Sequence, residues 1–385
     1  MLTRRHLRIK VFQALYALES ARDADYRLAD DFITDSFQPD LNSMTPQNPQ
    51  KLEGLRKTAS LILQESYNLG KITDEDAPTE AFVTAKNALA MYQKFYKEDQ
   101  QRIARRLVPE VEGVYDIYIK ILLLIAELTK VSTLDRERVY DDPDFPIARE
   151  AALDTNTIFK AVVTGTALET EVIRRGIHWE QNHVRKVYRE VFKTDETYKT
   201  YCAERKHSPE EDQELAQYVI KQVLFKHEEL VSNFEQADLF WEENGDLVRK
   251  MLVKTFKIIG EKGGLELVPL TDEWEEDQFF MQELFKLNIE NTHEYEEIIS
   301  VPLKNWELDR LALTDNLILK MGVAEMMNFP SIPLKVSINE YIEVAKEYST
   351  PKSGKFVNGM LDTLSKQLQK EGKIKKSGRG LMDNK

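Results

Sequence analysis

The chain has 385 residues, of which 42% are hydrophobic and 31% charged, a composition typical of a folded globular protein. A net charge of -13 argues against a protein that nucleic acid covers over its whole surface. The single cysteine excludes an internal disulfide and a multi-cysteine metal site, and it indicates a reducing compartment, most simply the cytoplasm.

Two segments bear on membrane association. The most apolar run, ILLLIA at residues 121–126, is far too short to cross a bilayer. The basic residues at the start are followed by no apolar run of the kind that a signal peptide carries. We therefore expect a cytoplasmic protein without a membrane partner.

Positive charge is concentrated at the two ends of the chain. The first ten residues carry Arg4, Arg5, Arg8 and Lys10 and no acid. The last twenty residues are also mainly basic, with seven cations against two acids, whereas residues 272–277 (DEWEED) are the densest part of an acidic interior. This pattern favours a localised anion site, although basic ends also occur as simple solubilising segments.

The apolar spacing predicts helices through nearly the whole chain. In residues 1–20 a buried stripe recurs at helical intervals: Leu7, Val11, Ala14, Leu15 and Leu18. The proline-rich residues 38–50 indicate a loop, and helices are expected at about 52–70, 77–107 and 109–131. The prolines in DDPDFP, at 141–146, predict a break. Helix then resumes over about 147–205 and 208–258, until the glycines at 260–264 end it.

The last eighty residues give the clearest helix signals. Residues 306–328 are apolar on most sides, which predicts a central buried helix. Ser337 and Glu340 have the spacing of a capping box, and Pro351 suits the first turn of a final helix. That final helix has a buried stripe of four residues: Val357, Leu361, Leu364 and Leu368.

No enzyme signature is found. The glycines at 260–264 follow no strand, and no G-x-S-x-G motif occurs. His178 and His183 are five residues apart, on different helix faces, which argues against joint metal binding. The acids at 272–277 lack the spacing of a calcium loop. We expect no catalytic residues, no metal and no cofactor.

The first helix carries a different signal. Arg5, Arg8 and Phe12 lie at i, i+3 and i+7 and share one face, with Tyr16 one turn further. Three more side chains extend this face: Arg4, Lys10 and Gln13. Guanidinium groups neutralise phosphates and aromatic rings stack on unpaired bases, as in single-stranded RNA binding. The alternative is a basic face that covers the core, with Phe12 and Tyr16 buried.

The loop before the last helix could complete such a site. Residues 349–355 (STPKSGK) supply hydroxyls, two lysines and free backbone amides at a helix N-terminus, where phosphates bind well. By itself a loop of this kind is usually only a helix cap. Together with the basic first helix, it predicts the second wall of an RNA-binding groove.

Several ordered motifs in these segments resemble one family. Residues 4–16 (RRHLRIKVFQALY) resemble the opening helix of NusB, and residues 306–325 resemble its central helix. Residues 332–346 (IPLKVSINEYIEVAK) and 355–362 (KFVNGMLD) are similar to its C-terminal signatures. The resemblance covers roughly residues 1–20 and 275–372.

Ordinary family members consist of that core alone, and the long insertion resembles forms known from Bacteroidetes. The resemblance implies an all-α fold, with a NusB-like core of two packed helical bundles and a large helical insertion. We accordingly expect a discontinuous core from residues 1–20 and 270–372, an insertion from 21–269, and a basic flexible tail from 373–385.

The resemblance also implies a function in transcription antitermination. Family members bind boxA-type single-stranded RNA in ribosomal RNA transcripts, together with a small-subunit ribosomal protein called NusE, and act on the RNA polymerase elongation complex. The acidic helix at 275–300 is where a basic ribosomal protein would bind. The expected RNA contacts are Arg4, Arg5, Arg8, Lys10, Gln13, Tyr16, Lys352, Ser353, Lys355 and Phe356. Many relatives have an acid where this chain has Lys352, which puts the family's base preference in doubt.

Two alternatives remain open. NusB-like domains also occur fused to rRNA cytosine methyltransferases, but this chain has neither an α/β cofactor domain pattern nor a second cysteine. The other alternative is a helical protein–protein adaptor in ribosome biogenesis that does not bind RNA, as would follow if the insertion covered the Arg5 face.

Overall fold

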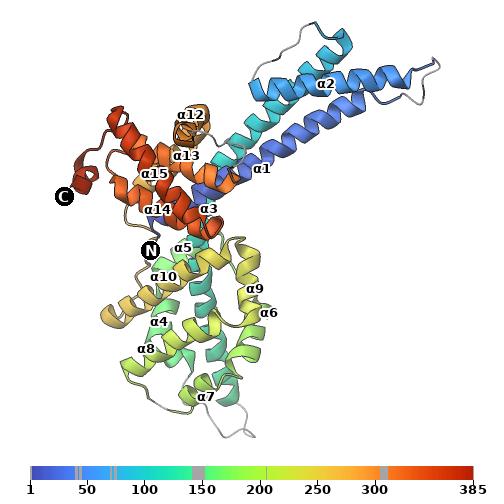
Figure 1. The fold of residues 1–385 in the computed structure, drawn as a ribbon. Helices are drawn as coiled ribbons and strands as arrows, with labels where there is room; N and C mark the ends of the chain where they lie inside the picture. Colours follow the sequence, from blue (N-terminus) through green and yellow to red (C-terminus); the bar gives the residue numbers. More distant parts are fainter. Residues whose placement is uncertain are drawn as a thin grey trace. The chain divides into compact units, whose positions relative to one another are not determined.

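The computed structural model describes residues 2–39, 46–69, 76–140, 152–204, 206–303 and 311–384, together with residues 42 and 72. Within these ranges every regular element is a helix (Figure 1). The prediction of an all-α fold is therefore confirmed. The predicted break at 141–146 lies outside the described residues.

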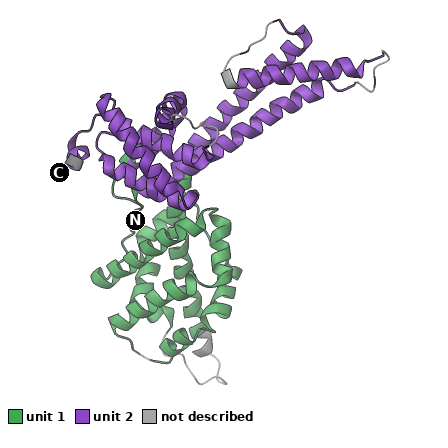
Figure 2. Ribbon diagram, in the orientation of Figure 1, with its two compact units in different colours: residues 1–4, 109–276 green, residues 5–108, 277–385 purple. Residues whose placement is uncertain are grey.

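The chain forms two compact units (Figure 2). One contains residues 1–4 and 109–276, and the other contains residues 5–108 and 277–385. This division follows compactness, and it assigns residues 21–108 of the expected insertion to the same unit as the C-terminal helices. The division into a family core and an insertion stays a prediction.

The unit of residues 5–108 and 277–385 holds the segments with the NusB resemblance. Its helices are α1 (Arg4–Ser36), α2 (Pro49–Leu69), the first part of α3 (Thr79–Tyr140), α11 (Trp274–Glu290), α12 (Thr292–Leu303), α13 (Leu313–Asn328), α14 (Leu334–Tyr348), α15 (Ser353–Lys370) and the 3-10 helix η5 (Gly378–Asn384).

Helix α13 is the centre of this unit. Eleven of its residues are buried, and they occur on every side of the helix, as the apolar sequence predicts. Helices α12, α14 and α15 pack around it. The predicted stripes of the first and last helices are buried too, because these helices turn their apolar faces to the same core.

The remainder of α1 contributes to a second cluster. Helix α1 continues well beyond residue 20. Its Ala29 and Ile33, and Phe37 directly after it, pack with α2 and the start of α3. Small residues of α3, among them Ala81, Ala85 and Ala88, line this cluster at intervals of about one turn. The three helices lie side by side in Figure 1.

The other unit contains the remaining helices, most of which are short. They are the second part of α3, η1 (Leu153–Thr155), α4 (Thr157–Thr164), α5 (Thr166–Arg175), α6 (Gln181–Val187), η2 (Tyr188–Phe192), α7 (Glu196–Cys202), α8 (Pro209–Tyr218), η3 (Val219–Leu224), α9 (Glu228–Ala237) and α10 (Trp241–Lys262). Helices α4, α8 and α9 pack on α10, which ends at Gly263 in the left-handed conformation.

Helix α3 differs from the sequence prediction. We expected a helix end near residue 108, but α3 runs through Pro109 without a break. Proline removes one backbone hydrogen bond and costs about 3 kcal/mol in a helix interior. Leu107 and Val111, on either side of it, are almost fully buried, and packing of this kind commonly overrides the local preference.

Two predicted helix starts are also wrong. Helix α14 begins at Leu334, so Ser337 lies inside the helix and does not cap it with Glu340. The Ser337 hydroxyl is buried and donates to Glu325 instead, at 2.7 Å. Helix α15 begins at Ser353, two residues after Pro351. Ser353 likewise donates to a buried acid of α13, Asp315, at 2.9 Å.

Candidate nucleic-acid interface

Arg8 lies in the core and not on the surface. Its guanidinium donates two hydrogen bonds to the carboxylate of Glu325 on α13, from Nε at 2.8 Å and from Nη2 at 2.7 Å. The side chains are 2% and 0% exposed. Tyr341 and Ser337 of α14 also donate to this carboxylate. The expected RNA contact at Arg8 is thus part of a buried network that joins α1, α13 and α14.

The charges in this network stabilise each other. Burial alone raises the pKa of the Glu325 carboxyl, but the Arg8 charge and the hydrogen bonds from Arg8, Ser337 and Tyr341 outweigh it, and the net pKa is lowered. Burial acts against the charged form of Arg8, and Glu325 reverses that effect, so the pKa of Arg8 is raised. Removing one partner of such a pair typically costs about 3–5 kcal/mol.

Arg4 is half-exposed and Arg5 is exposed, and each forms an ion pair with an acid. Arg4 forms an ion pair with Glu276. Arg5 donates to Glu340 of α14 from Nε at 2.9 Å and from Nη2 at 3.1 Å, and its side chain is 44% exposed. The hydrogen bond to Glu340 raises the pKa of Arg5, although burial opposes it. A phosphate would have to compete with Glu340 for this guanidinium.

The remaining predicted residues of α1 divide between core and surface. Lys10 is buried, and Gln13 is half-buried. Phe12 is 3% exposed, and its ring lies 5.3 Å from that of Tyr348, centroid to centroid. Tyr16 is 44% exposed and available for stacking. Phe12 is thus buried, as the alternative of a core-covering face predicts, whereas Tyr16 is not.

Asp315 holds the loop before α15. This buried carboxylate at the start of α13 accepts hydrogen bonds from Ser349 at 2.7 Å and from Ser353 at 2.9 Å. Thr350 also lies within hydrogen-bonding distance of the Ser353 hydroxyl. Ser353 is 2% exposed, so its hydroxyl serves the loop's conformation and does not face solvent.

The two lysines of this loop are the accessible cations. Lys352 is the N-cap residue of α15 and Lys355 lies in its first turn, and both are exposed. Neither side chain forms an ion pair or hydrogen bond with any residue in the described ranges. Phe356 beside them is half-buried. The N-terminus of a helix adds a favourable field for an anion at this position.

The structure brings the aromatic turn of α1 close to this loop. Phe12 contacts both Tyr16, at 6.4 Å between ring centroids, and Tyr348, which lies four residues before Lys352. The exposed members of the predicted set are Arg5, Tyr16, Lys352 and Lys355. Arg8, Lys10 and Ser353 are not available to a ligand in this arrangement, because they are buried.

Sequence reasoning missed the two acids that organise the site, Glu325 and Asp315. A signal for Glu325 was present, because a carboxylate in the most apolar helix of a chain has to be paired. Asp315 occupies the first turn of α13, where an acid is also favoured by the helix dipole, so its sequence position did not reveal its contacts with Ser349 and Ser353.

The fold and this site define an all-α protein in which a buried ion pair joins α1 to α13 and a second buried acid, Asp315, holds a lysine-bearing helix N-terminus. The sequence model described as the NusB family matches residues 264–366. A transcription antitermination protein NusB from Salinibacter ruber is 43% identical over 115 residues, which are 30% of this chain and 71% of that protein. The chain belongs to the NusB family.

Two further relatives have the same description. The protein from Chloroherpeton thalassium is 43% identical over 104 residues, 27% of this chain and 49% of its own length. The protein from Methylacidiphilum infernorum is 46% identical over 92 residues, 24% of this chain and 64% of its own length. The match thus spans less than two thirds of these two relatives. Most of the present chain lies outside each match.

A solved structure of NusB from T. maritima has 24% sequence identity and a TM-score of 0.25, over 42% of this chain and 95% of that one. In the part of the chain that the structure describes, none of the helices combines the length and the apolar character that a bilayer span needs.

Proposed function

We propose that this chain is a transcription antitermination factor that binds boxA-type single-stranded RNA and acts on the RNA polymerase elongation complex. The observation that carries the proposal is family membership, since the relative that shows it is described as a transcription antitermination protein. The exposed Lys352 and Lys355 at the start of α15 and the exposed Tyr16 on α1 add support, because cations and an aromatic ring suit an unpaired, stacked strand.

The test is the salt dependence of RNA binding. A fluorescently labelled boxA-like RNA is titrated with the full chain by fluorescence anisotropy over a range of salt concentrations. Each phosphate contact to a single strand contributes roughly 0.7 to the slope of log affinity against log salt. The double variant Lys352→Ala/Lys355→Ala is therefore expected to lower that slope by about 1.4.

A matched control lies at the other end of the same helix. Lys366 and Lys370 of α15 are also exposed lysines, about four and five turns from Lys352. Lys366→Ala/Lys370→Ala removes the same charge and should leave the slope unchanged. An equal effect of the two double variants would mean that only net charge matters. No binding at low salt, with or without the ribosomal partner, would contradict the proposal.

We also propose that a small-subunit ribosomal protein in the NusE role binds on α11 and α12. Between residues 277 and 303 these helices carry six acids and one lysine. Phe279 is 63% exposed and Val301 is 55% exposed, which supplies apolar area among the charges.

Phe279→Ala should weaken binding of a purified basic ribosomal partner at least tenfold, because the interface would lose a central aromatic contact. Leu28→Ala, at an exposed position on α1, is the control.

A protein–protein adaptor without RNA binding is the second candidate, and the ion pairs of Arg4 and Arg5 favour it. Both guanidinium groups already have acidic partners, so the surface of α1 carries less net positive charge than its sequence alone suggests. The adaptor predicts that the chain binds the ribosomal protein alone and that labelled RNA shows no saturable binding.

A further inference from the structure

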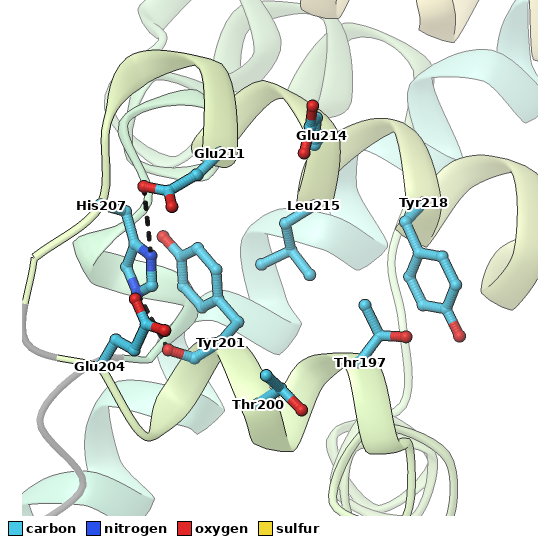
Figure 3. A pocket seen from close by; sticks show the side chains of 9 residues that line it. All are labelled: Thr197, Thr200, Tyr201, Glu204, His207, Glu211, Glu214, Leu215 and Tyr218. Carbon is cyan, nitrogen blue, oxygen red and sulfur yellow. Dashed lines mark hydrogen bonds and ion pairs between the residues drawn. The ribbon is translucent and has the colours of Figure 1, made fainter.

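A pocket in the unit of residues 109–276 lies far along the chain from the segments that match the family. It has a volume of about 510 Å³ and is lined by residues of α7, α8 and the connection between them (Figure 3). Glu204, His207 and Glu211 gather at one side of it, and each offers a donor atom within 4.8 Å of the other two. Thr197 and Tyr218 lie at the opposite side.

The tautomer of neutral His207 follows from the hydrogen bond that its Nε2 makes. Its Nε2 lies 2.9 Å from the backbone oxygen of Tyr201, and because a carbonyl oxygen can only accept, Nε2 carries a hydrogen and donates it. In the neutral ring the lone pair is then on Nδ1. A histidine whose other nitrogen donates to a carbonyl is the usual arrangement of a metal ligand, since that bond fixes the tautomer and the ring orientation.

The ring of His207 is also held rigidly. It stacks on the Tyr201 ring, with centroids 3.6 Å apart and planes inclined by 11°. The Tyr201 hydroxyl in turn donates to Asp212 at 2.6 Å, which fixes the tyrosine. The His207 side chain is only 7% exposed, yet its Nδ1 has no hydrogen bond with the described residues and faces the carboxylate of Glu211 at 3.9 Å. A ligand nitrogen is thereby held in place next to an anion.

Glu211 is positioned by its helix. It forms a capping box at the start of α8, in which the backbone amide of Ser208 donates to its Oε2 at 2.7 Å and its own amide bonds to the Ser208 hydroxyl at 3.2 Å. The start of α8 thus holds the Glu211 carboxylate beside His207.

The spacing suits a shared ion better than a direct hydrogen bond. Ligands of a tetrahedral Zn²⁺ lie about 2.1 Å from the ion, which places two of them about 3.4 Å apart. The 3.9 Å between His207 Nδ1 and Glu211 Oε2 is close to that value and too long for a hydrogen bond. Glu204 is exposed, so its side chain can turn toward the other two ligands without disturbing the core.

We propose that Glu204, His207 and Glu211 bind one divalent transition-metal ion of the Zn²⁺ class. One imidazole and two carboxylates form a donor set of nitrogen and oxygen that suits Zn²⁺, and three protein ligands leave a coordination position open toward the pocket. This set was not predicted from the sequence, because one of its ligands lies on a helix and the other two lie in the loop before it.

The test uses the full-length chain, freed of metal by a chelator. Isothermal titration with Zn²⁺ is expected to give one saturable site per chain, and Co²⁺ is expected to give the visible absorption of a tetrahedral complex. Residues that only support a metal ligand change affinity by about 10–100-fold, so loss of a ligand in Glu204→Gln or His207→Ala should cost at least roughly 100-fold. Both variants should also lose the Co²⁺ absorption.

His293 provides a matched control. It also has Nδ1 at 3.9 Å from a glutamate, Glu296, but its side chain is 92% exposed, and none of the described residues adds a third ligand there. His293→Ala should leave the affinity unchanged. Because His207→Ala also removes a stacked ring, Glu204→Gln decides the matter if circular dichroism shows that His207→Ala is misfolded. Absence of saturable binding, or wild-type affinity in Glu204→Gln, would overturn the proposal.

Discussion

The guanidinium of Arg8 and the carboxylate of Glu325 form a buried, two-point ion pair between residues 317 positions apart in the chain. The pair fixes the first helix against α13, while Ser337 and Tyr341 bring α14 to the same carboxylate. The N-terminal helix and the C-terminal helices are thus joined in one unit by a specific polar contact as well as by apolar packing.

Arg8→Ala should destabilise the fold strongly. It leaves the Glu325 carboxylate buried without its cation, and breaking a buried pair in this way costs about 3–5 kcal/mol. Urea denaturation followed by circular dichroism measures the loss. Arg56→Ala is the matched control, because Arg56 makes an equally short two-point contact with Glu53 on the surface. Its effect should stay below about 1 kcal/mol.

The double variant Arg8→Met/Glu325→Leu separates pairing from packing. Replacing both charges by apolar side chains of similar size is often neutral or stabilising. The double variant should recover only part of the stability that Arg8→Ala loses, because the buried Ser337 and Tyr341 hydroxyls lose their acceptor on Glu325. If it is as unstable as the single variant, the pair contributes more than the avoidance of an unpaired charge.

The pair also predicts how stability depends on pH. The folded pKa of Glu325 is lower than the unfolded value of about 4.3, so its contribution is fully present above that value and is lost as the pH falls through the folded pKa. The difference in unfolding free energy between the wild type and Glu325→Gln should be largest near neutral pH and shrink below about pH 4. Denaturant titrations at several pH values measure it, and a constant difference would contradict the prediction.

The sequence predicted the helices better than the roles of their polar side chains. The stripes of α1, α13 and α15 follow from apolar spacing, because a helix that buries one face repeats every three to four residues. The same spacing predicted that Arg5, Arg8 and Phe12 share one helix face, but it does not predict which residues that face contacts. Whether an arginine faces solvent or an acid far along the chain depends on tertiary packing.

Local signals failed where buried acids changed the helix ends. Ser337 has the sequence pattern of a cap, yet it lies inside α14 because its hydroxyl bonds to Glu325. In residues 152–262 a nearly continuous helical pattern corresponds to many short helices, two of them π-helical, and periodicity alone does not mark their ends. The cluster at Glu204, His207 and Glu211 joins a loop to a helix, so no single period reveals it.

Glu340→Gln should strengthen RNA binding, on the proposed function. Glu340 occupies the Arg5 guanidinium with two hydrogen bonds, and its charge repels a phosphate. Neutralising it should raise affinity for the boxA-like RNA several-fold at low salt, with a smaller gain at high salt because the effect is electrostatic. Anisotropy titrations measure the change. Glu343→Gln is the control. Glu343 is also near Arg5, but it accepts a hydrogen bond from Lys346, so its neutralisation should have less effect on RNA binding.

Asp315→Ala should loosen the loop before α15. The change leaves the Ser349 and Ser353 hydroxyls without their charged acceptor, at a cost of about 1.5–3 kcal/mol for hydrogen bonds of this kind. RNA affinity should fall, because Lys352 and Lys355 lose their fixed positions, but the salt slope should stay near that of the wild type because both charges remain. A slope reduced as in the lysine variant would contradict this.

Gly380→Ala should release the C-terminal segment from α13 and the turn that follows it. A Cβ at Gly380 would overlap the backbone oxygen of Pro330, an atom that cannot move aside as a side chain can. The same oxygen accepts a hydrogen bond from the Ser377 amide at 3.0 Å, and Lys376 donates to the Phe329 oxygen at 2.9 Å. Both bonds should be lost together, so amides of residues 373–384 should exchange hydrogen faster, while those of α13 stay protected.

Gly359→Ala is the control, since a Cβ there meets no atom within 4 Å and alanine favours the helix by up to about 1 kcal/mol. Equal exchange in the two variants would show that the segment is held by contacts other than those at Pro330.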